Sequence, residues 1–273
     1  MIRKILVPVD FSSGSAAALR YAEGFAEFVG ADALRVIHVF TPQVATGDAV
    51  VMPDMGELMD QRQTQLEQFL TTVPQAGNHR RTSELVLGFA ADKIIAEAEE
   101  HDLVIMGSTG DADFLEEVFG SISTEVSQKA HCPVLLVPNQ AEFREYEHIL
   151  YASNNLSLSR RAVLRFMDFS ELFHARVHFV HVNDEEGAHE GRRESLFAPL
   201  FNNPEPEFAF EIEEVTADSV QEGLVAYLKK QPIQLAVMVT KYRGFWERLF
   251  HHSDTRQMVL HPETPLLVLH LEG

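Results

Sequence analysis

The chain has 273 residues, and its 22 Lys and Arg against 41 Asp and Glu give a formal net charge of −19. This charge argues against nucleic acid and membrane surfaces as partners, because both attract proteins through Lys and Arg that neutralise phosphate. The single cysteine, Cys132, excludes an intrachain disulfide, and the first apolar run ends at Asp10, too early for a signal-peptide core or a membrane span, so we expect a cytoplasmic protein.

The first half of the chain alternates strand and helix patterns. Residues 4–11, KILVPVDF, form a β-branched apolar run, and residues 12–30 follow with helical spacing of apolar residues, a serine at the start and a glycine at the end. Further strands are expected at residues 33–40, 83–88, 102–107 and 133–138, and further helices at residues 57–73, 91–101 and 123–131. Five apolar strands joined by helices predict an α/β fold, with a mostly parallel sheet and helices on both faces.

The same order of strand patterns begins again near residue 145. Segments 148–155, 175–182, 234–239 and 264–269 match the first, second, fourth and fifth strands of the first half. This repetition predicts two tandem domains, residues 1–140 and residues 145–273, each with a five-stranded sheet. The short polar linker between them favours an intrachain pair with pseudo-two-fold symmetry. Further association of two chains into a homodimer, through the last strand of each domain, is left open.

A glycine motif follows the fourth strand of the first half. Gly107, Gly110, Gly120 and Ser121 stand in the order Gly, two residues, Gly, nine residues, Gly, Ser. Glycine lets backbone N–H groups approach an oxyanion, and the N-terminus of the following helix adds its dipole. Together with ILVPVDFS at the first strand, this motif resembles the universal stress protein family in its tandem form, and the resemblance covers essentially the whole chain.

The resemblance implies a fold like that of the adenine nucleotide α-hydrolases, of Rossmann type, and a stress-response protein that binds ATP, with or without Mg²⁺, in its N-terminal domain. Asp10 ends the first strand at the carboxyl edge of the sheet, where it can accept hydrogen bonds from a ribose, and Val39 offers an apolar face to adenine. The glycines permit approach to the phosphates, and the helix entry at residues 120–123 supplies N–H groups and hydroxyls. The expected nucleotide-binding residues are Pro8, Asp10, Val39, Met106, Gly107, Gly110, Gly120, Ser121, Ile122 and Ser123.

Four acids inside the motif, Asp111, Asp113, Glu116 and Glu117, oppose a triphosphate. Each unpaired contact at about 4 Å would cost a few kcal/mol at an effective dielectric constant near 20. Two arrangements relieve this repulsion: a surface loop that keeps the acids in water, or a Mg²⁺ ion that takes carboxylate and phosphate oxygens together. The solvated loop is favoured, and the acids are then expected to weaken binding without abolishing it.

The second half departs from the motif. In the strand alignment the three glycine positions hold Val239, Tyr242 and His252, only Ser253 remains, and Asn154 replaces the aspartate. Because a Cβ atom crowds the approach that glycine permits, we predict that the second half binds no ATP in the family's manner.

The corresponding loop of the second half, TKYRGFWERLFHHSDTRQ at residues 240–257, is basic and aromatic and contains the only tryptophan, Trp246. It could dock on the acidic loop of the first half or on a partner protein. The alternative is that its aromatic residues simply cover the core, and this is favoured.

Catalysis is not expected, although weak ATP hydrolysis or phosphoryl transfer is left open, with Asp10 as the one carboxylate near the site that could orient a metal ion or water. The chain has no GK[ST] sequence, and neither an arginine finger nor a general base is evident, so we assign no catalytic residue and no metal site. The alternative to nucleotide binding is a protein-interaction scaffold of the same fold that binds no nucleotide.

Overall fold

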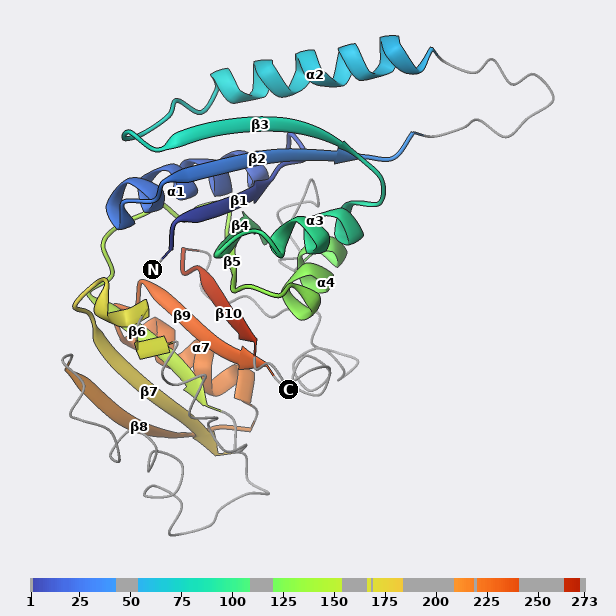
Figure 1. The fold of residues 1–273 in the computed structure, drawn as a ribbon. Helices are drawn as coiled ribbons and strands as arrows, with labels where there is room; N and C mark the ends of the chain where they lie inside the picture. Colours follow the sequence, from blue (N-terminus) through green and yellow to red (C-terminus); the bar gives the residue numbers. More distant parts are fainter. Residues whose placement is uncertain are drawn as a thin grey trace.

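The computed structural model describes residues 2–42, 54–108, 120–153, 166–167, 169–183, 209–218, 220–240 and 263–270. Its strands form one ten-stranded sheet in the order β3-β2-β1-β4-β5-β10-β9-β6-β7-β8 (Figure 1). The strands are β1 (Lys4–Pro8), β2 (Ala33–Phe40), β3 (Arg80–Leu87), β4 (Leu103–Gly107), β5 (Val134–Val137), β6 (His148–Ser153), β7 (Arg176–Asn183), β8 (Phe210–Thr216), β9 (Leu235–Thr240) and β10 (Leu266–His270). The helices are α1 (Ser13–Val29), α2 (Met55–Thr71), α3 (Ala90–Ala98), α4 (Ser121–Lys129) and α7 (Val220–Lys230). The expected α/β fold with a mostly parallel sheet is confirmed.

The two ends of the sheet follow one connection pattern. The order β3-β2-β1-β4-β5 is repeated as β8-β7-β6-β9-β10, and every pairing within either set is parallel. The sequence patterns missed β8, because the acidic residues of this edge strand, FEIEEVT, interrupt its apolar run. The division of the chain at residues 140–145 into two domains stays a prediction.

The two five-stranded sets meet at β5 and β10. These strands pair antiparallel, with Leu266 opposite Leu136, Leu267 opposite Leu135 and Val268 opposite Val134. The last strands of the two halves are therefore paired within one chain. A homodimer built through these same strands would have to break that pairing.

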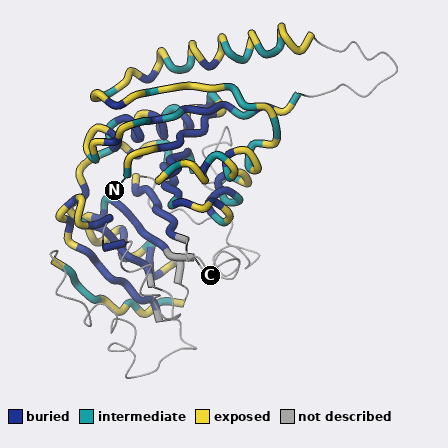
Figure 2. Tube along the Cα trace, in the orientation of Figure 1, coloured by how far each residue is buried: buried dark blue, intermediate teal, exposed yellow. Residues whose placement is uncertain are grey.

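Helices cover both faces of the sheet, because alternate residues of each strand point to opposite sides. Ile5 and Val7 of β1 belong to one core with residues of α1 and with Leu66 of α2, whereas Leu6 belongs to the other core with residues of α3, α4 and α7. Figure 2 shows the central strands buried and α2 with β3 largely exposed. Among the described helices, none combines the length and apolar character needed to cross a membrane.

Helix α1 begins and ends as its sequence predicts. The Ser12 side chain caps its N-terminus by accepting a hydrogen bond from the Ser15 N–H, and Gly30 ends it in the left-handed conformation at φ 64°. The apolar face differs at one position, since Phe28 remains 38% exposed. Its ring stacks on Phe173, with centroids 5.2 Å apart, in the segment before β7.

The linker between the halves contributes to the core. Tyr146 is fully buried, and its hydroxyl lies 2.5 Å from that of Tyr21 on α1. Phe143 packs so closely on α1 that a Cβ added to Gly24 would lie 3.1 Å from its ring. Although most linker residues are polar, its two aromatic residues attach it to the first half.

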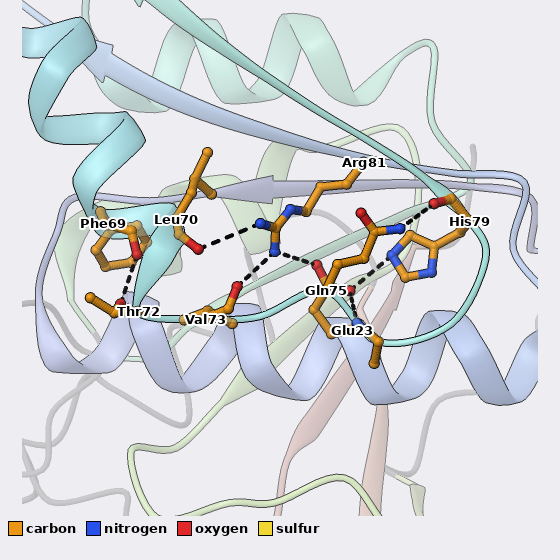
Figure 3. A network of polar contacts seen from close by, with 9 residues as sticks. Glu23, Phe69, Leu70, Thr72, Val73, Gln75, His79 and Arg81 are labelled. Atoms are coloured by element: carbon orange, nitrogen blue, oxygen red, sulfur yellow. Dashed lines mark hydrogen bonds and ion pairs between the residues drawn. The ribbon is translucent and has the colours of Figure 1, made fainter.

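A buried carboxylate joins α1 to the connection between α2 and β3 (Figure 3). Glu23, with a side chain only 3% exposed, lies 3.0 Å from Arg81 Nη1 and 2.9 Å from His79 Nε2, and it accepts a hydrogen bond from the Ala76 N–H at 2.9 Å. Arg81 also donates to the Val73 carbonyl at 2.8 Å. The buried Glu23 carboxylate is therefore paired with charged and backbone donors that all come from one segment of the chain.

Candidate functional site

A cavity of about 390 Å³ lies at the carboxyl ends of β1, β2 and β4. Parallel strands end at a common edge of the sheet, and the helices that follow them begin there, so strand ends and helix N-termini meet around one space. The lining residues are Pro8, Val9, Asp10, Ser15, Val39, Ala90, Ile94, Met106, Gly107, Gly120, Ser121, Ile122 and Ser123. Asp10 is the only ionisable side chain among these described residues.

The turn after β1 fixes the Asp10 carboxylate. Its Oδ1 accepts hydrogen bonds from the Ser12 N–H, at 3.1 Å, and from the Ser12 hydroxyl. The Asp10 N–H donates to Ser15 Oγ at 3.3 Å, and the Ser15 N–H donates to Ser12 Oγ at 3.1 Å. Within the described part of the chain, no residue donates to Asp10 Oδ2. This oxygen can therefore accept a hydrogen bond from a ligand in the cavity.

The N-terminus of α4 supplies the opposite wall. Its N-cap residue, Gly120, has no side chain to bond the N–H groups of the first turn, which leaves them able to bind an anion. The Ser123 hydroxyl lies 2.8 Å from the Ser108 carbonyl and 2.9 Å from the Gly120 carbonyl, so its proton is directed to the backbone. The expected contact between this hydroxyl and a phosphate stays a prediction, and it would require the hydroxyl to turn away from these carbonyls.

Nine of the ten residues expected to bind a nucleotide line this one cavity, and the tenth, Gly110, lies outside the described residues. The acidic loop, residues 241–257 of the basic aromatic loop and the second-half positions 154, 242, 252 and 253 also lie outside them, as does the side chain of Val239. The roles assigned to all these residues stay predictions.

Four lining residues were missed by the sequence analysis: Val9, Ser15, Ala90 and Ile94. Ser15 stands in the first turn of the helix after β1, and Ala90 and Ile94 belong to the helix after β3. The rule that ligands bind at the carboxyl ends of strands could have pointed to Ser15, Ala90 and Ile94, because each of them follows a predicted strand. Among the described residues, no three His, Cys, Asp or Glu side chains are grouped so as to hold a metal ion.

His38 lies beneath the turn that carries Asp10. It is buried, and its Nδ1 donates to the Val9 carbonyl at 2.8 Å, which requires the proton on Nδ1 because a carbonyl only accepts. Burial lowers the pKa of His38; the bond to Val9 and the charge of Asp10 partly offset this lowering, and Arg62 adds to it. Folding therefore favours the neutral form of His38 by lowering its pKa.

Replacing His38 with asparagine is expected to flatten the pH dependence of stability between pH 7.5 and 5.5. Because the pKa of His38 is lower in the folded state, the unfolded chain binds the proton first as pH falls through its ordinary value of about 6.5, and stability falls by at most ~1.4 kcal/mol per pH unit. Urea unfolding at several pH values measures the difference between the two slopes. His131→Asn, at a side chain 60% exposed, is the control, and identical slopes for wild type and His38→Asn would contradict the prediction.

Comparisons with a family model and with related sequences point to the same protein family, and a solved structure from that family shares the fold. Residues 1–138 match the model of the universal stress protein family. Universal stress protein MJ0531 of Methanocaldococcus jannaschii is 30% identical over 143 residues, which cover 50% of this chain and 82% of that protein. Universal stress protein MJ0577 of the same organism is 27% identical over 155 residues, which cover 50% of this chain and 95% of that protein. A solved universal stress protein from Archaeoglobus fulgidus superimposes with a TM-score of 0.69 at 17% identity, over 98% of this chain and 96% of its own, and this likeness bears on the fold alone.

Proposed function

Because the chain belongs to the universal stress protein family, we propose that its N-terminal half, residues 1–140, binds an adenine nucleotide in the cavity beside Asp10, with ATP as the preferred ligand. The observation that carries the proposal is that nine residues expected from the sequence to bind a nucleotide line one cavity. Its volume of about 390 Å³ falls within the roughly 300–1,000 Å³ of small-molecule sites.

The cavity lining offers a suitable contact to each part of an adenine nucleotide: the base, the ribose and the phosphates. Pro8, Val39 and Met106 offer apolar surface to the adenine ring. The Oδ2 of Asp10, to which no described residue donates, can accept hydrogen bonds from ribose hydroxyls. The first-turn N–H groups of α4, after Gly120, can bind phosphate oxygens. A Mg²⁺ ion would accompany the phosphates as their counter-ion, and Asp10 is the one carboxylate among the described lining residues that could contact it.

The proposed activity is binding and signalling, through conformation or protein partners in the cytoplasm, without catalysis. Phosphoryl transfer relies on Lys, Arg or metal ions around the transferred group, and the described lining residues include no Lys, Arg or His. The alternative, a scaffold of the same fold that binds no nucleotide, makes the opposite prediction for ligand binding.

Replacing Gly120 with valine is expected to weaken ATP binding about 100-fold or more, which corresponds to ~2.8 kcal/mol of binding free energy. The added side chain enters the cavity where the phosphate-binding turn of α4 begins. Isothermal titration calorimetry of wild type and variant with ATP, ADP, AMP and cyclic AMP measures the loss. Acid release and mass spectrometry of co-purified small molecules identify the ligand carried from the cell.

Gly56→Val is the matched control, because Gly56 is an exposed glycine in the first turn of α2, remote from the cavity lining. Its ATP affinity should equal that of wild type. The thermal midpoint of Gly120→Val should show that the variant is folded, since a less favourable N-cap costs about 1 kcal/mol. A wild-type protein that binds no adenine nucleotide, or equal affinities for wild type and Gly120→Val, would reject the proposed site.

A further inference from the structure

Phe11, the residue directly after Asp10, has an unusual backbone conformation. Its φ of 68° lies in the left-handed region, which bulky side chains rarely adopt. Glycine would occupy this conformation without strain, yet the chain has an aromatic residue there. Such strain persists only when the surrounding contacts compensate for it, so the contacts of the ring must account for its presence.

The Phe11 ring contacts two other aromatic rings. It stacks on the His38 imidazole, with ring centroids 4.1 Å apart and planes inclined by 27°. Its other neighbour is Phe69 of α2, at a centroid distance of 5.6 Å. His38 in turn donates to the Val9 carbonyl. The imidazole therefore contacts the turn on both sides of Asp10, through the carbonyl before it and through the aromatic ring after it.

Phe11 lies outside the cavity that Asp10 lines. The ring packs against the core on the α1 and α2 face of the sheet, whereas Ile94 and Met106 of the cavity belong to the core on the opposite face. Phe11 is also absent from the lining of the cavity. Any effect of this ring on a ligand must therefore pass through the turn, where no described residue donates a hydrogen bond to Asp10 Oδ2.

We infer that Phe11 is a positioning residue, which, clamped by His38 and Phe69, holds the Asp10 carboxylate with Oδ1 bonded to Ser12 and Oδ2 presented to the cavity. This inference rests on the proposed function for its ligand, because Asp10 is there the acceptor of ribose hydroxyls. Loss of the ring releases the turn, and the carboxylate then loses its orientation although no residue that lines the cavity has been replaced.

The test compares ATP with 2′,3′-dideoxy-ATP, which lacks the hydroxyls that Asp10 would bind. Hydrogen bonds to a charged group are worth enough for wild type to prefer ATP by about tenfold or more. Phe11→Ala should reduce this preference to about threefold or less, and Asp10→Ala should do the same. Phe11→Tyr retains the ring and should restore the wild-type preference. A purely structural role for Phe11 would lower the affinities for both ligands equally and leave their ratio unchanged.

The matched control is Phe28→Ala, which removes another partly exposed aromatic ring that stacks on Phe173 rather than on the turn. This variant should keep the wild-type preference. A Phe11→Ala protein with an unchanged ratio, or a wild type that binds ATP without preferring it, would overturn the inference.

A ligand-free measurement separates this inference from the proposed function. The Ser12 N–H is bonded to Asp10 Oδ1, so its hydrogen exchange reports the position of the carboxylate directly. Phe11→Ala should accelerate this exchange about tenfold or more, while the amide of Ile105 in β4 remains unchanged. If wild type binds no nucleotide but the Ser12 exchange rises, the proposed function fails and the positioning role stands. If the Ser12 exchange is unchanged, the positioning role fails.

Discussion

Replacing Glu23 with alanine is expected to lower the free energy of unfolding by about 3–5 kcal/mol, the range for breaking a buried ion pair by removal of one partner. Arg81 and His79 lie 3.0 and 2.9 Å from the Glu23 carboxylate, and their side chains are 17% and 1% exposed. Without the carboxylate, the Arg81 charge and the Ala76 N–H lose an acceptor that water cannot easily replace. The segment between α2 and β3 then loses its attachment to α1.

Glu27→Ala is the matched control for this prediction. Glu27 lies one turn later on the same helix and is exposed, so its replacement should change stability by no more than about 0.5 kcal/mol. Glu23→Gln keeps an oxygen for the Ala76 N–H but loses the charge, and should fall between the two alanine variants. Urea unfolding followed by circular dichroism measures all three. A Glu23→Ala protein as stable as Glu27→Ala would show that the network contributes nothing.

Replacing Leu267 with alanine is expected to cost about 2–5 kcal/mol, the range for removing a leucine side chain from a packed core. Leu267 of β10 is fully buried opposite Leu135 of β5, which is also fully buried. Both belong to a core that contains Ile5 and Val7 of β1 as well as Leu235 of β9. Because this core is shared, destabilising β10 should destabilise the first half as well as the second.

Differential scanning calorimetry tests this shared core. We expect a single transition for wild type and for Leu267→Ala, shifted to lower temperature in the variant. Leu87→Ala, at a leucine 40% exposed on the edge strand β3, should produce a much smaller shift. Two separate transitions, of which Leu267→Ala moves only one, would show that residues 1–140 and 145–273 unfold independently.

Much of the candidate site could be predicted because its residues follow predicted strands or occupy a fixed glycine spacing. Asp10 lies in the turn that follows β1, Met106 and Gly107 end β4, and Gly120 precedes α4, so a parallel α/β arrangement by itself places them at one edge. The hydrogen bonds could not be predicted in the same way. The spacing of residues does not fix the direction of a hydroxyl, and the bonds from Ser123 to two backbone carbonyls are known only from the structure.

The sequence by itself determined the order of strands and helices in the first half, the recurrence of four of its strands in the second half, and the cap residues of α1, because periodicity and capping depend on neighbours along the chain. Only the tertiary structure decided that β5 and β10 pair with each other, that Glu23 is buried among donors from another segment, and that Phe11 is held in a left-handed turn by His38 and Phe69. These features join residues far apart in the sequence. Their stability comes from burial and hydrogen bonding between segments, which no local pattern records.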